Sequence, residues 1–157
     1  MTNAIDVAHW FIASIDRDAG DSITHLKLQK LVYYAQAWAL ARLDKPLFEE
    51  DLEAWTHGPV VPSLFEQFKE TGWEALPYPD VVPTFENDVE TLLEEILDVY
   101  GQLSARHLEN LTHNETPWKA ARGDLPDEIR ATTPISKEIM KTYYQNLFKT
   151  LNEGQAT

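Results

Sequence analysis

The side chains that could serve catalysis or metal binding are few, because the chain has five histidines and no cysteine. His113 and Glu115 have the His-x-Glu spacing of zinc deaminases, but such a site also needs a pair of cysteines. His57, His107 and His113 lack the His-Glu-x-x-His spacing that places two imidazoles on one helix face. Without cysteine, disulfides and thiol nucleophiles are also excluded. A zinc site assembled from distant histidines stays an alternative, and we expect neither a metal ion nor a cofactor.

Arg106 and His113 suggest a second chemistry, the cleavage of a phosphodiester. Their spacing resembles the Arg-x(4–6)-His motif of HEPN ribonucleases, all-α enzymes in which the Arg and His bind the scissile phosphate and assist proton transfer. An RNA substrate favours a positive surface, whereas this chain has 26 acidic and 13 basic residues. Thr116 and Pro117 also begin a new helix just after His113. A HEPN-like ribonuclease is therefore an alternative hypothesis; in the other interpretation His113 bonds backbone carbonyls at a helix end.

The net charge of −13 bears on the partners of the chain. Non-specific binding to nucleic acid depends on basic side chains, which are scattered here, so we expect no nucleic-acid partner. No helix pair ends in a basic recognition helix, which leaves a DNA-acting regulator as a further alternative only. The acidity serves solubility or fits a partner with a basic surface, and composition does not choose between the two.

The membrane is not an expected partner either. No apolar segment is long enough to span a bilayer. The N-terminal residues lack the basic region and the long apolar run of a signal peptide, which predicts a cytoplasmic protein.

The element that must position these groups is a helix over residues 24–42. Twelve of the sixteen residues from Leu26 to Ala41 are apolar or aromatic. A helix that is apolar nearly all round has no solvent face, so we expect it at the centre of the fold. Gln29 and Gln36 lie seven residues apart and share one face. Buried amides must be hydrogen-bonded; these two either fix the backbone of a neighbouring loop or line a groove for a partner.

Apolar periodicity predicts the elements around this central helix. Helices are expected over residues 4–16, 62–71, 85–100, 104–112 and 116–122, and from 137 onwards. Asn87 and Glu90 have the spacing of a capping box. Residues 73–83 contain three prolines and are predicted to cross the surface in an extended conformation. The fold class is therefore all-α or nearly all-α, with six to seven helices and at most one short strand pair near residues 52–56. We expect one domain over residues 1–157 with a frayed tail at 152–157.

Three stretches, taken together and in this order, carry a resemblance to a known family. They are KLQKLVYYAQAWAL (27–40), EAWTHGPVVPSLFEQFK (53–69) and LTHNETPW (111–118). They resemble the Panacea antitoxin domain, also called the SocA-like or phage-associated GepA-like family. The segments PLFEEDLEAW (46–55) and ISKEIMKTYY (135–144) extend the similarity, which spans about residues 4–148.

The resemblance implies an antitoxin that is not an enzyme and that neutralises a cognate toxin, encoded next to it, by direct binding. Delivery of the toxin to a protease, as a proteolytic adaptor, is a further alternative. His57 replaces a Tyr that often precedes the Gly-Pro pair in the family. Most of the matched positions are expected to hold the fold, since apolar periodicity marks a core face. Among the candidates for contact, Trp55, Trp118 and Tyr34 are the first to test, because aromatic residues tend to anchor interfaces. By motif, the candidate partner-binding residues are Lys27, Gln29, Lys30, Tyr33, Tyr34, Trp55, His57, Gly58, Pro59, Val60, Thr112, Glu115, Pro117 and Trp118.

Overall fold

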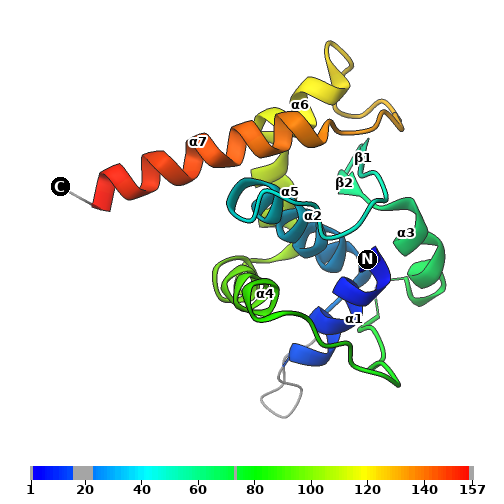
Figure 1. The fold of residues 1–157 in the computed structure, drawn as a ribbon. Coiled ribbons are helices and arrows are strands. Elements are labelled where there is room, and N and C mark those ends of the chain that lie inside the picture. Colours follow the sequence, from blue (N-terminus) through cyan, green and yellow to red (C-terminus); the bar gives the residue numbers. More distant parts are fainter. Residues whose placement is uncertain (1, 16–22, 73, 156–157) are drawn as a thin grey trace.

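The computed structural model of the chain describes residues 2–15, 23–72 and 74–155 (Figure 1). These residues form seven α-helices, one 3-10 turn and a two-stranded antiparallel sheet, which confirms the predicted nearly all-α fold. The elements are α1 (Ala4–Ser14), α2 (His25–Arg42), β1 (Glu53–Trp55), β2 (Gly58–Val60), α3 (Pro62–Phe68), η1 (Lys69–Thr71), α4 (Asn87–Tyr100), α5 (Ala105–His113), α6 (Thr116–Arg122) and α7 (Lys137–Gln155).

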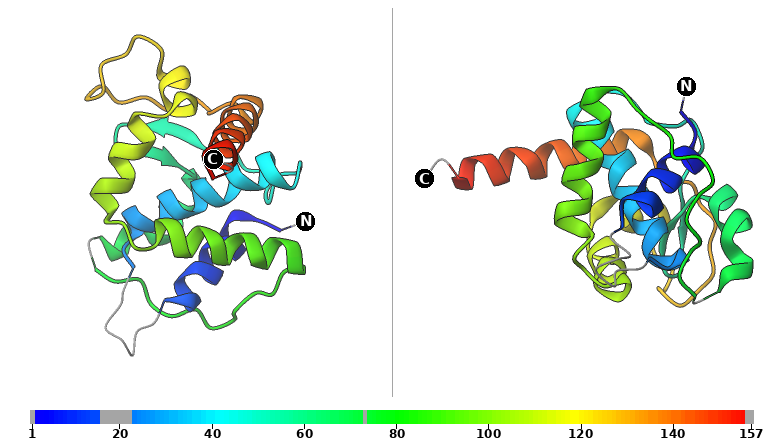
Figure 2. Two further views of the ribbon diagram at one scale, coloured as in Figure 1. Left: turned by 90° about the vertical axis from the view of Figure 1, so that its left-hand side faces the viewer. Right: turned by 90° about the horizontal axis from the view of Figure 1, so that it is seen from below.

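Helix α2 is the centre of the fold, as its sequence predicted. The side chain of Thr24 caps it by accepting the backbone N–H of Lys27. Fourteen of its 18 residues are buried. It packs against α1, α3, α4, α5, α7 and β2, so that its neighbours surround it (Figures 1 and 2). Because most of the other elements contact this one helix, it fixes where they lie relative to one another.

The two strands form a hairpin that is longer than the predicted pair near residues 52–56. Glu53 pairs with Val60 and Trp55 with Gly58, across a turn at Thr56 and His57. Pro59 has no backbone N–H, but a two-stranded sheet has only edge strands, where proline is tolerated. The segment before α7 extends the hairpin through an isolated bridge between Glu53 and Pro134.

Several element boundaries differ from the prediction. Helix α1 ends at Ser14, and residue 16 lies outside the described residues. Helix α4 begins two residues late with Glu86 at its N-cap, and the Glu90 carboxylate reaches back to the N–H of Phe85 instead of completing a capping box with Asn87. In the crossover, residue 73 is not described and Leu76 is fully buried, which anchors that segment to the core.

The end of α7 also differs: the helix continues to Gln155 through the tail that we expected to fray from residue 152. Apart from Gly154, the residues there do not oppose helix strongly, so the helix continues. Figures 1 and 2 show this C-terminal half extending beyond the rest of the molecule. No helix in the described part of the chain is both long and apolar enough to cross a membrane.

Candidate functional site

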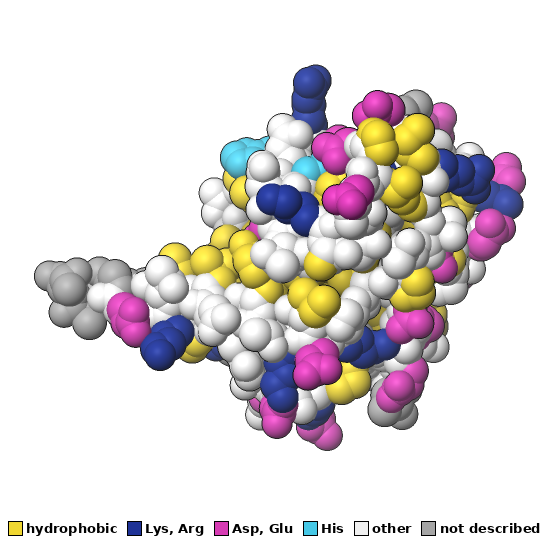
Figure 3. Space-filling view, turned by 90° about the horizontal axis from the view of Figure 1, so that it is seen from above, with side chains coloured by type: hydrophobic (Ala, Val, Ile, Leu, Met, Phe, Trp, Pro, Cys, Tyr) yellow, Lys and Arg dark blue, Asp and Glu magenta, His cyan; other side chains and the backbone are white. Residues whose placement is uncertain are grey.

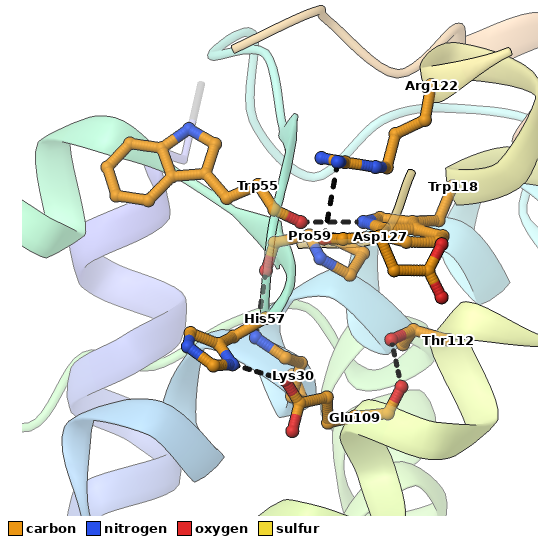
Figure 4. Close-up of polar contacts among 9 residues, drawn as sticks. All are labelled: Lys30, Trp55, His57, Pro59, Glu109, Thr112, Trp118, Arg122 and Asp127. Carbon is orange, nitrogen blue, oxygen red and sulfur yellow. Dashed lines mark hydrogen bonds and ion pairs between the residues drawn. The ribbon is translucent and has the colours of Figure 1, made fainter. Parts of the chain in front are cut away.

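About half of the candidate residues lie on or against the β1–β2 hairpin, and Lys30 of α2 lies beneath it (Figure 4). Lys30 is fully buried, and its Nζ donates to the carbonyl oxygen of Pro59 at 3.3 Å. Burial lowers the pKa of Lys30 to about 8, and the negative charge of Glu109 opposes this shift only partly. Gly58, at φ +110°, comes so close that a Cβ there would lie 2.7 Å from Cε of Lys30 and 2.9 Å from Oγ1 of Thr112. Only glycine fits this position.

The two glutamines of α2 hold loop backbone, which confirms the first of the two interpretations of their role. Gln29 accepts the N–H of Val61 at 2.9 Å through Oε1 and donates to the carbonyl of the same residue at 3.4 Å. Gln36 accepts the N–H of Leu47 at 2.7 Å and donates to the carbonyl of Phe48 at 2.9 Å. Both amides are therefore satisfied by main-chain groups inside the protein.

Helix α6 holds the other side of the hairpin. The indole N–H of Trp118 donates to the carbonyl of Trp55 at 2.8 Å (Figure 4). Nη1 of Arg122 donates to the carbonyl of Ala54 at 2.9 Å. The guanidinium of Arg122 lies 4.9 Å from the centre of the Trp118 ring and also donates to the carbonyl of Pro126. Arg122 is not among the residues predicted from the sequence, although its i, i+4 spacing from Trp118 indicates that the two side chains share a helix face.

A second polar cluster joins α2, α6 and α7 around the carboxylate of Glu115. The hydroxyl of Tyr34 donates to Oε1 of Glu115 at 2.6 Å, and that of Tyr144 donates to the same oxygen at 3.1 Å. Burial raises the pKa of Glu115, while these two hydrogen bonds oppose the shift. Tyr33 bonds the Tyr144 hydroxyl at 2.9 Å, and the ring of Tyr34 stacks on that of Tyr100. This cluster ties the N-terminal half of α7 to the core.

Little of the candidate set reaches the surface. Lys27, Trp55 and Glu115 are half-buried, and the side chain of His57 is 71% exposed at the hairpin turn, where Nδ1 contacts a carboxylate oxygen of Glu109 at 2.5 Å. Tyr34 and Trp118 are buried, so neither presents its ring at the surface of the free chain, and their part in binding a partner stays a prediction. The buried members are Gln29, Lys30, Tyr33, Tyr34, Gly58, Pro59, Val60, Thr112, Pro117 and Trp118.

The structure does not bring Arg106 and His113 to a common open site. Arg106 is exposed and lines, with His107 and Asn110, a surface hollow of about 460 Å³ on α5. The ring of His113 instead stacks on Trp118 with centroids 4.0 Å apart, and its Nε2 is buried without a hydrogen-bond partner among the described residues. Burial also lowers the pKa of His113. Within the same described ranges, no group of three or more His, Asp or Glu side chains could hold a metal ion.

The family follows from comparison with known proteins. The sequence pattern of the antitoxin SocA-like, Panacea domain family matches residues 28–119, more than half of the chain. This chain belongs to that family. The match confirms the predicted resemblance, and it runs from within α2 to within α6, so that it includes the whole hairpin. Helix α7 lies outside the residues that the Panacea pattern matches.

One curated relative is Antitoxin SocA of Caulobacter vibrioides (strain NA1000 / CB15N). It is 29% identical to this Panacea domain chain over an alignment that covers 61% of this chain and 58% of that protein. The alignment thus spans less than two thirds of the relative's length. No solved structure matches the chain.

Proposed function

We propose that this chain is an antitoxin that neutralises a cognate toxin, encoded next to it, by direct protein–protein contact and without catalysis. The observation that carries the proposal is the Panacea family match over residues 28–119, together with the Antitoxin SocA relative. We further propose that residues 1–157 act as one domain. One hydrophobic core receives residues from each of α1 to α7 and supports this.

The geometry at the hairpin supports binding over catalysis because three buried polar groups there already have structural tasks. The Nζ of Lys30, the guanidinium of Arg122 and the amide of Gln29 all bond main-chain carbonyls next to or within the hairpin. A general acid or base must come within hydrogen-bond reach of its substrate. These three groups are buried, so a substrate does not reach them without displacing the hairpin.

The negative net charge of the chain supports a toxin whose binding surface is basic. At a net charge of −13, the chain attracts positively charged surfaces and accelerates their association at low ionic strength. Binding should therefore weaken as salt increases.

Co-expression with the product of the adjacent open reading frame tests the proposed function. We expect the chain to restore growth and to purify as a complex with that product. Arg106→Ala is the matched variant for the ribonuclease alternative, because the Arg106 side chain is exposed and its loss leaves the core intact. Unchanged neutralisation by Arg106→Ala is the expected result. An RNA-cleaving activity of the purified chain that disappears in Arg106→Ala would overturn the proposal.

A further inference from the structure

The crossover between η1 and α4 (described residues 74–86) exposes three large apolar side chains within five positions. Tyr78 is 56% exposed, Val81 75% and Val82 42%. We call these three residues the crossover patch. Val81 has the highest exposure of any large hydrophobic residue in the described part of the chain. Single exposed apolar residues are ordinary at a protein surface, whereas neighbouring ones mark an interaction site more often.

The crossover runs along the surface to α4, and its backbone has little freedom (Figures 1 and 2). Three prolines between residues 76 and 83 fix their own φ angles and push the residue before each of them towards extended geometry. At one end Leu76 is fully buried, and its N–H donates to the carbonyl of Ile23 at 2.8 Å. At the other end the N–H of Phe85 donates to Glu90 at 3.3 Å. Because the segment is already ordered, less conformational entropy opposes its binding to a partner.

The crossover and α4 together form the most acidic part of the chain. From Glu70 to Ser104 there are nine acidic residues and no lysine, arginine or histidine. Within the described residues, three basic side chains from α2 and the loop after it reach this stretch, which leaves an excess of six negative charges. They are Lys27 at the carbonyl of Gly101, Arg42 at Glu95, and Lys45 at Glu86 and Asp88. Lys69, just before the stretch, is paired with Glu66.

Two carboxylates beside the crossover patch have no basic partner among the described residues. Asp80 lies between Tyr78 and Val81 in the sequence, Glu74 precedes them, and both acidic residues are exposed. The surface therefore complements a partner that carries basic groups beside an apolar area. A second copy of the chain would bring the same negative charge and is disfavoured. On the opposite face of the molecule, basic side chains lie among the acidic and hydrophobic ones (Figure 3).

We propose that the crossover patch is the docking site for the toxin, which covers it with an apolar groove that has a basic rim. This inference rests on the proposed function and adds to it the surface and the chemistry of the partner. Extended segments that contain proline bind aromatic-lined grooves in this way. Tyr78 supplies an aromatic anchor, Val81 the most exposed apolar contact, and Asp80 between them the negative charge.

The test measures binding of the purified product of the adjacent open reading frame by calorimetry. Val81→Lys removes apolar contact and places a positive charge against a basic partner, whereas Val81→Glu removes the same contact with the opposite charge. Both variants should fold, because Val81 lies outside the helices and strands and is 75% exposed. We expect Kd to rise about tenfold or more for Val81→Lys and less for Val81→Glu.

Leu125→Lys is the matched control, since it makes the same change in net charge at another exposed apolar residue. Leu125 is 43% exposed in the loop after α6, which lies at the other end of the molecule in Figure 1. We expect its Kd to change less than about twofold. Asp80→Asn removes the charge within the patch and should make Kd less sensitive to salt than in wild type.

Each other outcome contradicts a defined part of the proposal. Wild-type affinity in both Val81 variants would exclude this surface while leaving the proposed function intact. Equal losses for Leu125→Lys and Val81→Lys would assign the effect to net charge and would also exclude the patch. A weaker complex for Val81→Glu than for Val81→Lys would exclude a basic occupant. A dimer of the free chain in sedimentation that becomes monomeric in both Val81 variants would assign the patch to a second copy. Absence of binding by the wild-type chain would overturn the proposed function and, with it, this inference.

Discussion

Replacing Lys30 with methionine should change how the stability of the chain depends on pH. In the folded chain the pKa of Lys30 is about 8, because its ammonium group is buried, whereas the ordinary value for lysine is 10.5. Between these values the unfolded chain binds more protons than the folded chain, so the free energy of unfolding rises with pH. Methionine fills a similar volume and does not titrate, so Lys30→Met lacks this rise.

The magnitude follows from the two pKa values. Holding the ammonium in the buried site costs about 3 kcal/mol at pH 7, and raising the pH to 9.5 removes about 2 kcal/mol of this cost. Near pH 10, Tyr33, Tyr34 and Tyr144 lower the free energy of unfolding as pH rises. Burial raises their pKa values, so the folded chain retains protons that the unfolded chain releases. These tyrosines are present in both proteins, so the difference between wild type and Lys30→Met isolates the lysine.

Urea denaturation followed by tryptophan fluorescence, at steps from pH 7 to pH 9.5, measures this difference. We expect wild type to gain about 2 kcal/mol relative to Lys30→Met over that range. Parallel curves for the two proteins would refute the burial of a charged Lys30, because an exposed lysine keeps its ordinary pKa and contributes nothing in this window.

Three further substitutions test the contacts at the hairpin and at Glu115. Gln29→Ala leaves the buried backbone N–H and carbonyl of Val61, just after β2, without their partner. Urea denaturation should show a free energy of unfolding that is about 3 kcal/mol lower. A decrease below about 1 kcal/mol would mean that water replaces the amide. Gly58→Ala should destabilise the chain by about 2 kcal/mol more than Gly72→Ala in thermal unfolding. Both glycines have a positive φ, but only the Cβ at Gly58 would clash, since no atom lies within 4 Å of a Cβ at Gly72. Equal destabilisation by the two substitutions would contradict the close approach of Lys30 to Gly58. Tyr34→Phe removes a hydrogen bond that favours the ionised form of Glu115, so its pKa should rise further in a carbon-detected NMR titration, and a fall would show that the bond is absent in solution.

The helices were predictable because their signals are local. The apolar residues of α2, the Thr24 cap and the Ser104 cap of α5 depend on neighbours within a few positions. The start of α4 was predicted two residues early because no capping side chain marks it: Glu86 stands at the N-cap and makes no side-chain cap hydrogen bond.

The burial of Lys30 could not be predicted from its own helix. A lysine on an apolar helix ordinarily extends its ammonium to solvent. It is enclosed here because Gly58 and Thr112 approach it from segments 28 and 82 positions later. Arg122 is similar, since its partners in β1 and in the loop after α6 meet only in the folded chain. The roles of both residues therefore depend on long-range contacts.

Most of the residues in the matched motifs are buried, so replacing them tests the stability of the fold rather than the contact with a partner. A residue such as Trp118, which bonds the backbone of β1 and is 2% exposed, contributes to any complex by holding the hairpin in place. Its replacement should weaken binding only as far as it unfolds the chain. Leu151 of α7 has the opposite character: it is 53% exposed, so its replacement leaves the core unchanged, and any loss of binding would have to come from a contact with the partner. Comparing the change in stability with the change in Kd at these two positions therefore distinguishes the scaffold from the contact surface.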